Sequence, residues 1–86
     1  MVLKIVEMVF EKIENGEMLF VSVKHGASHI IDAVIPDRIS TEDGGIYIEG
    51  ENLILNITGE KEFIITFDNV EEEFIITQGE VTYCLS

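Results

Sequence analysis

The chain between Ile46 and Leu85 reads IYIEGENLILNITGEKEFIITFDNVEEEFIITQGEVTYCL. Large side chains recur there at every second residue, which is the period of a β-strand. Gly, Asn, Asp and Glu interrupt the rhythm at intervals, as expected of turns. This two-residue alternation therefore predicts four short strands, at Leu53–Thr58, Phe63–Phe67, Phe74–Thr77 and Val81–Leu85.

The alternation also assigns the two faces, because successive side chains of a strand point to opposite sides. One face is apolar throughout and is the predicted core, made of Leu53, Leu55, Ile57, Phe63, Ile65, Phe67, Phe74, Ile76, Val81, Tyr83 and Leu85. The other face is mostly polar, but Ile54, Ile64 and Ile75 occupy matching positions in three of the runs. Isoleucines on an outer face predict a cover, which is the N-terminal segment, a second subunit or a partner.

Residues 2–14 fit two structures. As a helix, their apolar residues fall on one broad side and their charged residues on the other. As a strand, they form a hairpin through Asn15-Gly16, and the same dipeptide also suits the end of a helix. The hairpin pairs Ile13 with Met18, Phe10 with Val21 and Met8 with Val23. The β-branched content and the lack of a residue to cap a helix start favour the strand.

Three further strands are predicted, at Met18–Lys24, His29–Ile35 and Ile46–Glu49. Pro36 ends the second of these because proline cannot donate a ladder hydrogen bond. Residues 36–45 read as a polar connection with room for one helical turn, and residues 58–62 and 68–73 read as hairpin loops.

The fold class that follows is all-β and mainly antiparallel. We expect one domain over residues 1–86, built as a small barrel or a two-layer sandwich of about seven or eight short strands. If residues 2–14 are an α-helix packed on the sheet, the domain is α+β instead.

The formal net charge is −12, from 17 acidic and 5 basic residues. Residues 46–86 carry 9 of the acids and a single base, Lys61. A negative field of this size repels phosphate backbones and anionic membranes, and it attracts a basic protein or a cation. We therefore expect no direct nucleic-acid binding and no membrane binding.

The N-terminus has no basic leader followed by a long apolar region, so no secretory signal is predicted. A single cysteine, Cys84, excludes an intramolecular disulfide and fits a reducing, cytoplasmic location. No stretch reaches the roughly 18 apolar residues of a membrane span.

The sequence gives little basis for catalysis or cofactor binding. It has no nucleophile elbow and no glycine-rich phosphate loop, so we expect neither an enzyme nor a bound cofactor. His25 and His29 with Asp32 are weak candidates for a metal site. The acidic loops lack the ligand pattern of a calcium-binding loop.

The leading hypothesis for function is a non-enzymatic acidic domain that docks to a basic protein, in one version as a nucleic-acid mimic or inhibitor. Its contact residues are expected on adjacent loops and are Glu60, Glu62, Asp68, Glu71, Glu72 and Glu73. An alternative is a self-associating assembly domain that uses Ile54, Ile64 and Ile75. A third is a small metal-binding protein that uses His25 and His29.

Overall fold

The N-terminal segment is an α-helix in the computed structural model, which describes residues 1–86. Helix α1 (Val2–Asn15) ends at Gly16, whose left-handed backbone lets the N–H groups of Gly16 and Glu17 bond to the last turn. The prediction of a strand hairpin was therefore wrong and the helical alternative is confirmed. Ile5 and Val9 are fully buried, and packing of this apolar face outweighs the modest strand preference of β-branched residues.

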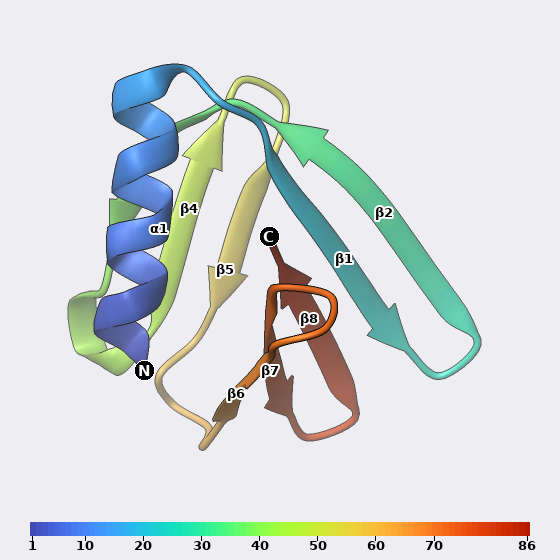
Figure 1. The fold of residues 1–86 in the computed structure, drawn as a ribbon. Helices are drawn as coiled ribbons and strands as arrows, with labels where there is room; N and C mark the ends of the chain where they lie inside the picture. The colour runs from blue at the N-terminus through green and yellow to red at the C-terminus, as the bar shows by residue number, and fades with distance from the viewer.

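Eight strands follow the helix and pair only in antiparallel fashion (Figure 1). They are β1 (Leu19–His25), β2 (Ser28–Val34), β3 (Pro36–Ser40), β4 (Ile46–Gly50), β5 (Ile54–Ile57), β6 (Ile64–Asp68), β7 (Glu73–Gln78) and β8 (Val81–Leu85). One sheet has the order β2-β1-β8-β7-β6 and the other the order β3-β4-β5. The domain is thus mostly antiparallel β with one helix, and the two sheets do not close into a barrel.

Two segments that were expected to be loops are instead a strand and a connection between the two sheets. Pro36–Ser40 is strand β3, and Pro36 is accommodated at its first residue, just before a register shift toward Arg38. Residues 58–62 do not close a hairpin, because β5 pairs with β4 while β6 pairs with β7 in the other sheet. They carry the chain from one sheet to the other. The expected helical turn is present as a short 3₁₀ helix at Glu42–Gly44.

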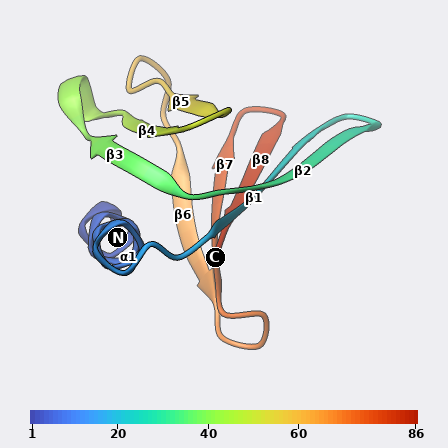
Figure 2. The ribbon, with the colours of Figure 1, turned by 90° about the horizontal axis from the view of Figure 1, so that it is seen from above.

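The five-stranded sheet joins segments far apart in the sequence. Its central strand β8 pairs with β7 through a tight turn and with β1, where Val21 lies opposite Leu85. Beyond β8, the backbones of Phe20 and Ser86 exchange two hydrogen bonds of 2.9 and 3.0 Å. The end of the described chain is therefore fixed beside β1 (Figure 2).

The hydrophobic core lies between the helix and the inner faces of the two sheets. It consists of Ile5, Val9, Leu19, Val21, Val34, Ile46, Ile48, Leu55, Ile57, Phe74, Ile76 and Leu85. The strand alternation predicted Leu55, Ile57, Phe74, Ile76 and Leu85 correctly, and most of the remaining predicted core residues are partly buried. Phe67 is the exception. It is 39% exposed, because β6 is an edge strand with no neighbour beyond it.

Candidate functional site

An apolar groove runs between helix α1 and the β6–β7 hairpin. Its main part has a volume of about 520 Å³ and is lined by Met8, Lys12, Phe20, Phe67, Glu71, Glu72, Phe74, Leu85 and Ser86. A second hollow of about 280 Å³ adjoins it at Phe67 and Phe74 and is also lined by Met1 and Lys4. The groove is thus open along the first three turns of the helix.

The helical wall of the groove is a single stripe of side chains. Met1, Lys4, Met8 and Lys12 recur at intervals of three or four residues, so they lie above one another on one face of the helix. Met8 and Lys12 are partly buried, whereas Lys4 is exposed. The buried residues Ile5 and Val9 lie next to this stripe and hold the helix on the core.

The opposite wall is aromatic. Phe67 and Phe74 are directly paired across β6 and β7, with ring centroids 4.9 Å apart and an interplanar angle of 62°, an edge-to-face contact. Phe74 is buried, but Phe67 exposes 39% of its surface to the groove and solvent. Phe20 of β1, which is 54% exposed, adds a third ring. Two accessible aromatic rings, backed by the buried ring of Phe74, are suited to hold an apolar side chain.

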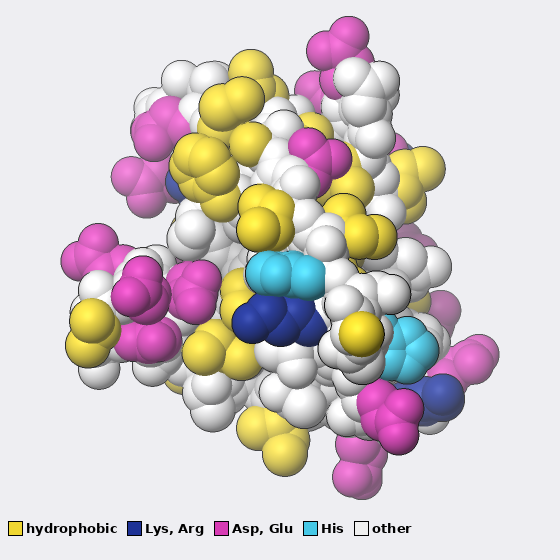
Figure 3. Space-filling view, turned by 90° about the vertical axis from the view of Figure 1, so that its right-hand side faces the viewer, with side chains coloured by type: hydrophobic (Ala, Val, Ile, Leu, Met, Phe, Trp, Pro, Cys, Tyr) yellow, Lys and Arg dark blue, Asp and Glu magenta, His cyan; other side chains and the backbone are white.

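A projecting acidic loop forms the rim of the groove. The Asp68 carboxylate accepts hydrogen bonds from the backbone N–H groups of Val70 and Glu71, at 2.9 and 3.3 Å, and so shapes the turn. Val70 is 88% exposed, and Glu72 adopts a left-handed backbone with φ of 53°. Figures 2 and 3 show this loop standing away from the body, with acidic side chains gathered on it.

The charges around the groove are not neutralised within the chain. The structure contains one ion pair, between His25 and Glu80 at 3.8 Å, and both side chains are exposed. Lys12 lines the same groove as Glu71 and Glu72 without pairing with either. The helical wall of the groove is therefore basic, and the rim beside the aromatic wall is acidic.

The six acidic residues proposed from the sequence fall into two groups. Asp68, Glu71, Glu72 and Glu73 belong to the β6–β7 hairpin, whereas Glu60 and Glu62 lie in the connection before β6. Six residues of extended chain separate Glu62 from Asp68, a distance of about 20 Å. The structure brings the first four together and leaves the other two at the far end of β6.

The three outer isoleucines are not one row. Ile54 belongs to the three-stranded sheet and is 76% exposed. Ile64 and Ile75 share the outer face of the five-stranded sheet, where Ile64 is 70% exposed and Ile75 is partly buried. The N-terminal helix packs on the inner side, so it covers neither Ile54 nor Ile64.

The two histidines do not converge. His29 lies opposite Lys24 and His25 opposite Ser28, so their side chains leave opposite faces of the β1–β2 hairpin. Asp32 is further along β2, and its carboxylate accepts a 2.8 Å hydrogen bond from the N–H of Ala33. No group of three His, Cys, Asp or Glu side chains is arranged to hold a metal ion.

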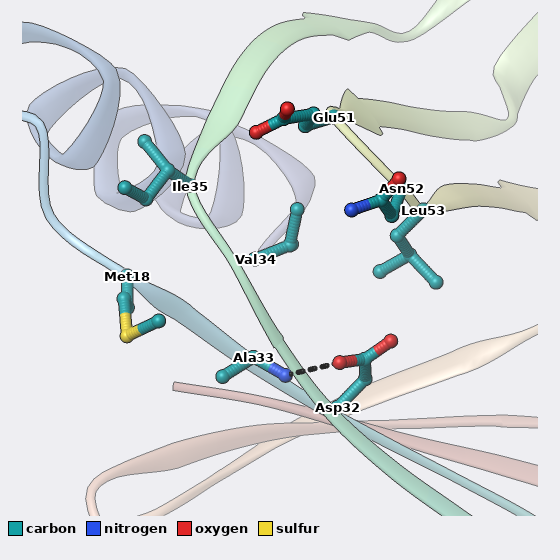
Figure 4. A pocket seen from close by; sticks show the side chains of 8 residues that line it. All are labelled: Met18, Asp32, Ala33, Val34, Ile35, Glu51, Asn52 and Leu53. Atoms are coloured by element: carbon teal, nitrogen blue, oxygen red, sulfur yellow. Dashed lines mark hydrogen bonds between the residues drawn. The ribbon is translucent and has the colours of Figure 1, made fainter.

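Another cavity, of about 220 Å³, lies where β2 passes the β4–β5 turn (Figure 4). Its polar side chains are Asp32, Glu51 and Asn52, and the remaining lining residues are Met18, Ala33, Val34, Ile35 and Leu53. Asp32 is turned to its neighbour's backbone, and no buried polar side-chain atom in the structure lacks a partner. The cavity therefore offers no activated group.

Sequence reasoning missed the groove because its lining comes from the helix and four strands, which are separate in the sequence. Met8 and Lys12 were assigned to a strand and Phe67 to the core. A helical reading of residues 2–14 would have placed Met1, Lys4, Met8 and Lys12 on one stripe, but not opposite Phe67. Helix α1, with 14 residues, falls short of the length that a membrane-spanning helix requires. No family model, curated protein or solved structure matches the chain.

Proposed function

We propose that this domain is a non-enzymatic binding module that docks a basic amphipathic segment of a partner protein in the groove between α1 and the β6–β7 hairpin. The observation that carries the proposal is the combination of an open aromatic wall with an unpaired acidic rim. Apolar side chains of the partner fill the space against Phe20, Phe67 and Met8. Its lysines or arginines meet Glu71 and Glu72.

The two kinds of contact contribute differently. Burial of apolar surface gives about 25 cal/mol per Å² and supplies most of the affinity. The carboxylates, together with the net charge of −12, attract a basic partner over longer distances and accelerate association. Binding should therefore weaken with added salt, and mainly through a slower association rate.

The lysines on the helical wall set the orientation of the bound segment. Lys4 and Lys12 repel a partner's basic side chains, while Glu71 and Glu72 attract them. The segment is thus expected to turn its basic side toward the hairpin and a neutral or acidic side toward the helix. Replacement of Lys12 by Glu should accordingly increase the affinity for a basic segment.

The separation of the acidic residues bears on the nucleic-acid mimic version of this function. A mimic needs carboxylates spaced along one surface as phosphates are along a strand. Glu60 and Glu62 lie about 20 Å from the hairpin acids by the extended length of β6. The geometry therefore gives more support to a groove that takes one segment than to an extended phosphate-like array.

The experiment uses a labelled synthetic peptide of 14 residues, made of Leu and Lys in an amphipathic helical pattern, titrated by fluorescence anisotropy. Reversal of both rim charges, E71K with E72K, should weaken binding at least tenfold. The matched control is E60K with E62K, which changes the net charge equally at the far end of β6. At 0.15 M salt, charges that far apart are largely screened, so the control should lose less than threefold.

A neutral substitution tests the groove separately from the charge. Phe67→Ser removes an accessible ring without altering the net charge, and it should weaken the peptide several-fold while Lys12→Glu strengthens it. Equal losses for the two charge-reversed proteins would show that the peptide recognises net charge alone. Full binding by the Phe67→Ser protein would show that this ring is not part of the binding site. Either result would refute the proposal.

A further inference from the structure

The outer face of the five-stranded sheet is uncovered. Helix α1 and the three-stranded sheet both lie on its inner side and share one hydrophobic core with it (Figure 2). Strand alternation and the register place three rows of side chains outward. They are Ala33, Phe20, Ser86, Glu73 and Asp68; then Ile31, Ser22, Cys84, Ile75 and Thr66; then His29, Lys24, Thr82, Thr77 and Ile64.

The face is apolar at its edges and hollow at its centre. Ile31, Ile64 and Phe20 are 71%, 70% and 54% exposed, which is unusual for side chains of this size. Between them, the small residues Ser22, Cys84 and Ser86 leave a depression of about 160 Å³ that Glu73 also borders. Large exposed side chains beside a hollow are the features of a surface that is completed by another molecule.

The basic and the acidic residues of this face lie at opposite ends of it. Lys24 and His29 are directly paired at one end, and Asp68 and Glu73 are directly paired at the other. Lys24 makes no ion pair in the chain, although the chain has 17 acidic residues. Figure 3 shows a His side chain against a basic one near the middle of this side, surrounded by hydrophobic groups, with the acidic projection beside it.

We propose that a second copy of this chain covers this face and forms a two-fold symmetric dimer. Ala33, Cys84 and Ile64 lie on one diagonal of the face, by the register of the strands. Lys24 is one strand and one row from Cys84 on one side of this diagonal, and Glu73 is one strand and one row away on the other. A two-fold axis along the diagonal therefore brings Lys24 onto Glu73 of the second copy, twice.

The same axis places apolar residues of one copy against apolar residues of the other. Ile31 and Phe20 lie on either side of the diagonal, so each faces the other across the interface, and Ile64 meets its own symmetry mate. Cys84 meets itself at the centre. The two sheets cross at a steep angle, as in orthogonal sheet packing. Strand spacings give a face of about 24 by 20 Å, the lower end of specific interfaces, so the dimer should be weak and reversible.

This inference concerns a surface other than the docking groove, although Phe20 borders both. The test is sedimentation velocity of the full chain at several concentrations, with a dimer constant expected near the micromolar range. Lys24→Glu and Glu73→Lys should each weaken the dimer at least tenfold, because each places like charges together twice. The double variant K24E with E73K should restore it, since the exchanged pair is again complementary.

Two further measurements complete the test. Lys61→Glu has the same charge change as Lys24→Glu but lies off the face, so it should leave the dimer intact. A bismaleimide linker of about 10 Å, the spacing of packed sheets, should join the wild-type chains through Cys84, because directly opposed Cα atoms at that spacing are too far apart for a disulfide. A monomer at all concentrations, a dimer indifferent to Lys24→Glu, no restoration in the double variant, or failure of Cys84 to cross-link would each overturn the proposal. None of these outcomes depends on the peptide titration.

Discussion

The side-chain amide of Gln78 donates a 2.7 Å hydrogen bond to the backbone carbonyl of Thr58, 20 residues earlier in the chain. The same nitrogen donates a second bond, of 3.0 Å, to the carbonyl of Lys61. Gln78 is only 8% exposed at the end of β7. One buried side chain therefore ties the connection between the two sheets to the larger sheet.

Replacement of Gln78 by Leu should lower the free energy of unfolding by about 1–3 kcal/mol, because two partly buried carbonyl groups lose their donor. Urea denaturation followed by circular dichroism measures the change. Thr77→Ala, next to it on the exposed side of β7, serves as the control and should cost less than about 0.5 kcal/mol. Equal stability of the two variants would mean that water replaces the amide at no cost.

Gly59 is packed against the 3₁₀ turn, so a larger residue at this position should clash with the backbone of the turn. A Cβ atom at Gly59 would lie 2.1 Å from the carbonyl oxygen of Asp43 and 2.7 Å from the carbonyl carbon of Gly44. Gly59→Ala should therefore destabilise the fold by about 2–3 kcal/mol in thermal or urea denaturation. Gly26→Ala meets no atom within 4 Å but must keep a φ of +60°, so a smaller loss of about 1 kcal/mol is expected.

The attachment of helix α1 depends on its two fully buried side chains. Ile5→Ala should reduce the free energy of unfolding by about 2–5 kcal/mol, because it leaves a cavity between the helix and the sheets. Leu3→Ala is the matched control on the same helix, since Leu3 is 68% exposed, and it should change stability by less than about 0.5 kcal/mol. Similar losses for both variants would contradict the observed orientation of the helix.

The strand pattern predicted local features well. The two-residue alternation identifies β6, β7 and β8 and most of the residues that they bury. Asn15-Gly16 suited both a hairpin turn and a helix end, and the structure shows the helix end. Residues 2–14 were misassigned because β-branched residues favour strands only weakly, while burial of Ile5 and Val9 depends on a core that the local sequence does not show. Pro36 was read as a terminator, although the first residue of a strand tolerates it.

The pairings between distant segments could not be predicted from local pattern. The alternation is equally compatible with β5 beside β6 or β5 beside β4 alone, so the change of sheet at residues 58–62 was missed. The β1–β8 pairing joins residues about 60 positions apart and leaves no local signal. The candidate groove depends on both pairings, which explains why its aromatic residues were known individually but not as one surface.

The position of β8 at the middle of the larger sheet also constrains the order of assembly during synthesis. A nascent chain on the ribosome that lacks residues 81–86 has the β1–β2 and β6–β7 hairpins but nothing to join them. The helix and the three-stranded sheet can form earlier from neighbouring segments. The larger sheet cannot be completed until its last strand has left the exit tunnel, so until then part of its apolar inner surface stays exposed.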